Sequence, residues 1–91
     1  MARVGRHVVV TGRVQGVFFR AWTQEQARTL GVAGWVRNCS DGSVEAHLAG
    51  EEDAVGRLVE RLSEGPRAAR VDDVRVDEVA PEPGESFEVR R

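Results

Sequence analysis

Hydrophobic residues recur along the chain with two periods, and the changes of period mark the predicted elements. A run rich in Val and Thr over residues 6–14 predicts a buried first strand. A helix over about residues 20–30 follows, because one helical face carries apolar or small positions at Phe19, Thr23, Ala27 and Leu30. Gly31 is placed to end that helix, since glycine readily adopts the backbone angles of a helix C-terminus.

The second half of the chain repeats this alternation of strand and helix. Residues 33–38 read as a second strand, and the pair Asp41-Gly42 predicts a tight hairpin into a third strand over residues 43–48. A second helix begins near the acidic residues 51–53, whose charge suits a helix N-terminus, and Gly65-Pro66 ends it. Alternating valines predict a fourth strand at Val71, Val74, Val76 and Val79, and residues 86–89 form a short closing strand.

This order of elements predicts the fold class α+β with a ferredoxin-like split β-α-β arrangement. We expect an antiparallel sheet of four main strands plus a short edge strand, with two helices on one face. A chain of 91 residues can build one hydrophobic core, so residues 1–91 are expected to form a single domain.

Charge is unevenly distributed although the net charge is only −2. Six Arg and one Glu give residues 1–37 a charge of +5, whereas residues 38–91 carry −7. A positive first third suits a small anion, and the acidic remainder argues against a nucleic-acid partner, whose binding depends on many phosphate contacts. The chain has no Lys, which excludes Schiff-base chemistry through lysine and the Walker-type phosphate loop.

Location follows from what the sequence contains and lacks. No apolar run approaches the 18 or so residues of a membrane span, and the N-terminus leads directly into a strand without a secretory segment. The single cysteine, Cys39, cannot form an internal disulfide and favours packing over a nucleophilic role. We therefore expect a cytoplasmic protein with no membrane partner.

Topology brings two candidate site segments together. In a right-handed β-α-β crossover the two strands run parallel, so the loop 15–20 and Asn38 lie at the same sheet edge. The third strand between them sets a backbone separation of about 10 Å, which side chains can span. Gly16 allows successive N–H groups to point inward, the helix start adds donors, and the Arg20 guanidinium can grip two phosphate oxygens.

Simpler structural explanations remain open for each of these residues. Short glycine loops between strand and helix are often only turns, and Asn38 before a turn commonly satisfies backbone groups. Aromatic residues should support the fold: Phe18 and Phe19 are expected to anchor the two sides of the loop, and Trp22 and Trp35 to pack in or near the core. The two histidines, His7 and His47, are expected to line the sheet without a catalytic role.

Three motifs resemble the acylphosphatase family: GRVQGVFFR at residues 12–20, GVAGWVRN at 31–38 and DGSVE at 41–45. The resemblance covers nearly the whole chain and implies hydrolysis of the carboxyl-phosphate bond of acyl phosphates, with no metal or cofactor. It implies that Arg20 binds the phosphoryl group and that Asn38 orients the attacking water. The backbone of the remaining loop residues would complete the phosphate cradle, namely Gln15, Gly16, Val17, Phe18 and Phe19.

Further expectations concern the reaction and its partners. In cysteine phosphatases a Cys stands six positions before the cradle Arg, but Val14 stands there in this chain, so direct attack by water is favoured over a covalent intermediate. The expected ligands are a small-molecule acyl phosphate as substrate and inorganic phosphate as product and competitive inhibitor. The protein is expected to be a monomer.

Two other classes of function stay in competition with the enzyme. The same cradle could recognise a phosphoryl group without turning it over, which would make the chain a binding module. The same order of elements also serves RNA-recognition domains, but those stack bases on aromatic residues of the two central strands. The predicted first and third strands carry no Phe, Tyr or Trp, which disfavours RNA.

Overall fold

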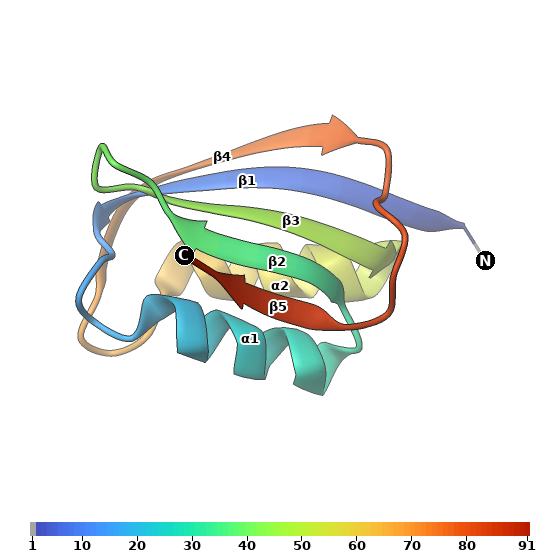
Figure 1. Cartoon of the computed structure of the whole chain (residues 1–91), viewed down its shortest axis with the longest axis horizontal. Helices are drawn as coiled ribbons and strands as arrows, with labels where there is room; N and C mark the ends of the chain where they lie inside the picture. Colours follow the sequence, from blue (N-terminus) through green and yellow to red (C-terminus); the bar gives the residue numbers. More distant parts are fainter. Residues whose placement is uncertain (1) are drawn as a thin grey trace.

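Five strands form one sheet, and two helices cover one of its faces (Figure 1). This computed structural model describes residues 2–91. The elements in chain order are β1 (Arg3–Arg13), α1 (Phe19–Leu30), β2 (Ala33–Asn38), β3 (Val44–Glu51), α2 (Glu52–Glu64), β4 (Arg70–Val79) and β5 (Phe87–Arg90). The predicted α+β class, the order of elements and the placement of both helices are confirmed.

The sheet has the strand order β4-β1-β3-β2-β5. As predicted, β3 lies between β1 and β2 and pairs antiparallel with both, so β1 and β2 run in the same direction. The sheet is mixed rather than antiparallel throughout, because β5 pairs parallel with β2. After β4 the chain crosses from one edge of the sheet to the other, and β5 then runs back in the direction opposite to β4 (Figure 1).

The hydrophobic core lies between the sheet and the two helices. From α1 it takes Phe19, Thr23 and Ala27, and from α2 it takes Val55, Leu58 and Leu62. The sheet contributes its helix-facing residues, including Val8, Val10, Val36, Val44, Ala46 and Leu48, which are all at most 2% exposed. Truncating a buried Leu to Ala in such a core typically costs about 2–5 kcal/mol of stability. This core fixes the start of α1 against the ends of the strands.

Gly31 ends α1 as the sequence predicts. Its backbone is left-handed, with φ of 71°, and the N–H groups of Gly31 and Val32 bond to carbonyls of the last helical turn. This turn costs little for glycine, which lacks the Cβ that crowds other residues in that conformation. The chain can therefore return immediately as β2, which carries Asn38 back to the end of the molecule where α1 begins.

The predicted element bounds are correct to within a few residues, and the differences follow from strand pairing. β1 begins at Arg3 and β3 continues to Glu51 because these two residues pair in the sheet. Glu51 is consequently the last strand residue, and α2 begins one residue later. Within residues 2–91 no helix combines the length and apolar character that crossing a membrane requires.

Candidate active site

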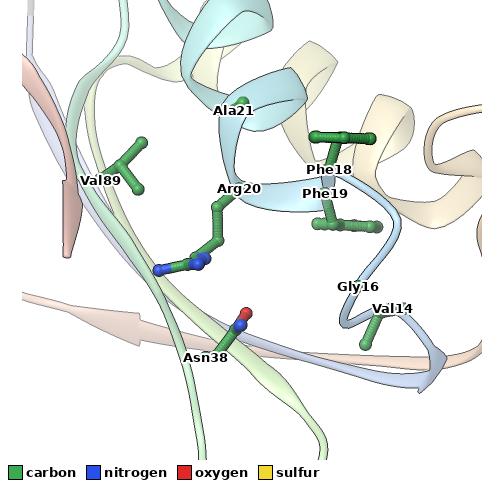
Figure 2. Close-up of a pocket in the computed structure, with 8 residues that line it drawn as sticks. All are labelled: Val14, Gly16, Phe18, Phe19, Arg20, Ala21, Asn38 and Val89. Atoms are coloured by element: carbon green, nitrogen blue, oxygen red, sulfur yellow. The ribbon is translucent and has the colours of Figure 1, made fainter. Parts of the chain in front are cut away.

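An open pocket of about 380 Å³ lies where β1 and β2 end and α1 begins (Figure 2). Its lining residues are Val14, Gly16, Phe18, Phe19, Arg20, Ala21, Asn38 and Val89. The loop 15–20 and Asn38, which are far apart in the sequence, thus meet at one site. Of the residues expected there, Gln15 and Val17 do not line this pocket. Val89 of β5 and Ala21 of α1 line it and were not anticipated.

The loop has the backbone of an anion cradle. Gly16 and Phe18 both have left-handed backbones, with φ of 72° and 60°. Alternation of left-handed and ordinary residues turns successive N–H groups toward one concave side, where they can bind an anion. A Cβ built on Gly16 would meet nothing within 4 Å, so its backbone angle, and not crowding, favours glycine there.

Buried side chains anchor this loop to the hydrophobic core. Val14, Val17 and Phe19 are at most 9% exposed and belong to the hydrophobic core. The Phe19 ring packs edge-on against Trp22, with ring centroids 5.6 Å apart, and the Phe19 carbonyl accepts a hydrogen bond from the Thr23 hydroxyl. The backbone of the cradle is therefore held on a rigid support.

Phe18 differs from its predicted role. It was expected to anchor the loop together with Phe19, but its side chain is 86% exposed. The left-handed backbone of Phe18 turns its side chain away from the core, while Phe19 enters the first turn of α1 and points inward. Phe18 also occupies the N-cap position of α1 without making a side-chain cap bond.

Arg20 extends from the first turn of α1 toward the ends of β2 and β5, and its guanidinium lies between Val89 and Asn38 in Figure 2. One terminal nitrogen donates a 2.9 Å hydrogen bond to the carbonyl of Arg90. The first turn of α1 contains no acidic residue. The positive end of the helix dipole and the guanidinium therefore reinforce each other, which favours an anion in the pocket.

Asn38 is the last residue of β2. The hairpin that follows it is held by hydrogen bonds from the side chain of Gln15, a residue of the cradle loop. The amide nitrogen of Gln15 donates to the carbonyl oxygens of Cys39 and Ser43, at 2.7 and 2.8 Å. Asp41 accepts bonds from the hydroxyl and the backbone N–H of Ser43, and these bonds lower the pKa of its carboxyl. The Gln15 side chain thus links the loop 15–20 to the hairpin after Asn38. The sequence predicted only that the Gln15 backbone would take part in the phosphate cradle.

On the face of the sheet that does not contact the helices, polar side chains form a second hydrogen-bond network. Glu45 accepts hydrogen bonds from His7 at 2.6 Å and from Arg37, and chiefly the His7 bond holds the pKa of the Glu45 carboxyl below its usual value. His47 is buried, stacks on Trp35, and accepts a bond from the backbone N–H of Glu82. Burial lowers the pKa of His47. Neither histidine lines the pocket.

The described residues bring together few groups that could serve as metal ligands. Across residues 2–91, no set of three or more His, Cys, Asp and Glu side chains is arranged to hold a metal ion. Cys39 is partly exposed and lies next to the pocket without lining it; its sulfur is 4.0 Å from a Glu45 oxygen. The pocket's polar side chains are those of Arg20 and Asn38.

Comparison with known proteins identifies the family to which this chain belongs. The family model described as acylphosphatase matches residues 6–89. A relative called acylphosphatase from Nitrobacter hamburgensis is 55% identical, over 96% of this chain and 94% of its own length. The structure of an acylphosphatase from Coxiella burnetii superimposes with a TM-score of 0.93 at 43% identity, covering 97% of this chain and 93% of that one.

A second solved structure extends the comparison. The acylphosphatase from Bacillus subtilis superimposes with a TM-score of 0.91 at 36% identity and covers 97% of this chain and 99% of its own. Relatives with the same name therefore match this chain over nearly their full length. The chain belongs to the acylphosphatase family of hydrolases, whose substrate class is the acyl phosphates.

Proposed function

We propose that the chain hydrolyses the carboxyl-phosphate bond of acyl phosphates by direct attack of water on phosphorus, releasing a carboxylate and inorganic phosphate. The observation that carries this proposal is the convergence of Arg20, the cradle loop and Asn38 on one pocket. An acyl phosphate already has a good leaving group. Catalysis can then rest on positioning and on stabilising the charge of the phosphoryl oxygens.

In this proposal Arg20 and the cradle hold the phosphoryl group. The guanidinium offers paired N–H donors to two phosphate oxygens, and its bond to the Arg90 carbonyl keeps the fork in a fixed direction. The backbone N–H groups of Gln15, Gly16, Val17, Phe18 and Phe19 surround the remaining oxygens. Together they neutralise negative charge at the centre where water must attack.

Asn38 orients the attacking water through its side-chain amide. A neutral amide can bind water and phosphate oxygen at once, whereas a carboxylate at this position would repel the substrate. The remaining side chains that line the pocket are apolar, so no ionisable general base or side-chain nucleophile stands among them. The substrate's own phosphate is the group proposed to accept the proton of the water.

Isotope labelling tests the direction of attack. Hydrolysis of an acyl phosphate in water enriched in oxygen-18 is followed by mass spectrometry of both products. Attack on phosphorus places the label in inorganic phosphate and leaves the carboxylate unlabelled. Label in the carboxylate would show attack at the carbonyl carbon and would reject the proposed roles of Arg20 and Asn38.

The proposal includes the state of the protein and its inhibition. Residues 1–91 are proposed to act as a single domain, and the protein is proposed to act as a monomer. Inorganic phosphate competes with the substrate, since the cradle that binds the phosphoryl group also fits the product. The second candidate function is a binding module that holds a phosphoryl group without turnover. The same pocket supports both functions, and turnover distinguishes them.

A further inference from the structure

Two of the four large exposed hydrophobic side chains in the described part of the chain lie at the candidate active site. Phe18 is 86% exposed and Val89 is 40% exposed, and both line the pocket. The other two, Val76 and Val79, lie on β4 at the opposite edge of the sheet. Ala21 adds a third exposed apolar side chain to the pocket.

Phe18 combines several local features that a folded chain normally avoids. It is the only residue other than glycine with a positive φ in the described structure, a conformation that costs of order 1 kcal/mol. It stands at a helix N-cap, where Ser, Asp or Asn would supply a hydrogen bond, and makes none. Its ring lies in solvent. A role in binding accounts for the three features together.

The proposed direction of water attack suggests which part of the substrate Phe18 would contact. In phosphoryl transfer the attacking and leaving oxygens lie roughly in line through phosphorus. Figure 2 shows Asn38 on one side of the Arg20 guanidinium, and Phe18 and Ala21 on the other side, at the N-terminal end of α1. If water approaches from Asn38, the leaving carboxylate and the group attached to it point toward Phe18, Ala21 and Val89.

We propose that Phe18, Ala21 and Val89 form an apolar platform that receives the acyl group, so that aromatic and other apolar acyl phosphates are preferred. This inference rests on the proposed function. An aromatic ring on such a platform would leave water and contact the Phe18 ring in a stacked or edge-on geometry. An acetyl group is too small to reach most of this surface and would gain little.

Selectivity between two substrates tests the platform. The ratio of kcat/KM for benzoyl phosphate to that for acetyl phosphate is measured for the wild type, Phe18→Ala and Phe18→Gly. Comparing ratios between variants cancels the different intrinsic reactivity of the two substrates. Both variants remove the ring, while Gly alone suits the left-handed backbone, so the pair separates loss of the ring from relief of strain.

The platform predicts that the ratio falls by about five- to tenfold in both Phe18 variants. Val89→Ala should lower it in the same direction, and its matched control Val79→Ala, which has similar exposure on the far edge, should not. A ratio within about twofold of the wild type in either Phe18 variant would overturn the inference. Hydrolysis of both substrates would then leave the proposed function standing, whereas hydrolysis of neither by the folded wild type would overturn both.

Discussion

A terminal nitrogen of the Arg20 guanidinium lies 2.9 Å from the backbone carbonyl oxygen of Arg90, to which it donates a hydrogen bond. This bond joins the first turn of α1 to the end of β5. It occupies one of the five N–H donors of the guanidinium and leaves the others for a ligand. The Arg20 side chain therefore links α1 to β5 and also directs its remaining N–H donors toward the pocket.

Replacing Arg20 by Lys is predicted to be nearly as harmful as replacing it by Ala. An ammonium group cannot hold the Arg90 carbonyl and two phosphate oxygens in one plane, so kcat/KM should fall by about 100-fold or more in both variants. Steady-state kinetics with benzoyl phosphate measures the effect. Arg28→Lys, in the last turn of the same helix, is the control and should behave as the wild type. Near-normal turnover by Arg20→Lys would show that the paired N–H donors of the guanidinium are not required.

Asn38→Ala is predicted to lower turnover while leaving phosphate binding nearly intact. Asn38 is proposed to hold water, so kcat should fall by about 100-fold and the inhibition constant of inorganic phosphate should change by less than about threefold. Both quantities come from inhibition kinetics on the same sample. A parallel loss of phosphate affinity would instead assign Asn38 to the phosphate.

The Gln15 side chain is predicted to matter for both stability and turnover. Gln15→Leu removes the two bonds to the Cys39 and Ser43 carbonyls and should cost about 1–2 kcal/mol of unfolding free energy, together with a fall in kcat. Urea unfolding and kinetics measure the two effects. Gln26→Leu is the matched control, because Gln26 is also half-buried and accepts a hydrogen bond from Arg61, and neither residue lines the pocket. An equal loss of kcat in Gln26→Leu would show that the effect is general destabilisation.

His47 is predicted to make the free energy of unfolding fall as the pH drops below about 6.5, the usual pKa of histidine. Its pKa is lowered in the folded state, chiefly by burial, and its ring accepts the N–H of Glu82 only when neutral. The unfolded chain therefore takes up the proton more readily, so this contribution is complete above the usual histidine pKa and is lost as pH falls below it. Thermal or urea unfolding should show a shallower pH dependence for His47→Gln than for the wild type. If the free energy of unfolding depends on pH equally in the two proteins, His47 is not the cause of the pH dependence.

Pattern and topology explain why the meeting of the two candidate site segments could be predicted. The crossover rule requires the loop after β1 and the end of β2 to meet, so Arg20 and Asn38 could be placed at one edge without coordinates. The helix stop at Gly31 and the hairpin at Asp41-Gly42 follow from local backbone preferences. These features depend only on neighbouring residues or on a general rule of chain connection.

Features that depend on a particular backbone angle or a distant contact could not be predicted. Phe18 and Phe19 are identical in type, and only the left-handed backbone at Phe18 decides which ring is buried. The parallel pairing of β5 depends on the path of the β4–β5 loop, which His47 helps to hold through Glu82. The two hydrogen bonds from the Gln15 side chain reach the carbonyls of Cys39 and Ser43, which lie 24 and 28 positions further along the chain. The cytoplasmic location and metal independence stay predictions.

Hydrolysis of benzoyl phosphate in the presence of a metal chelator tests the central claim most directly, with the wild type compared with Arg20→Ala by ultraviolet absorbance. The account predicts rapid hydrolysis by the wild type and little by the variant, with both shown to be folded by circular dichroism. Absence of turnover by a folded wild type would contradict the account and favour the binding module. Turnover that Arg20→Ala retains would place the chemistry outside this pocket.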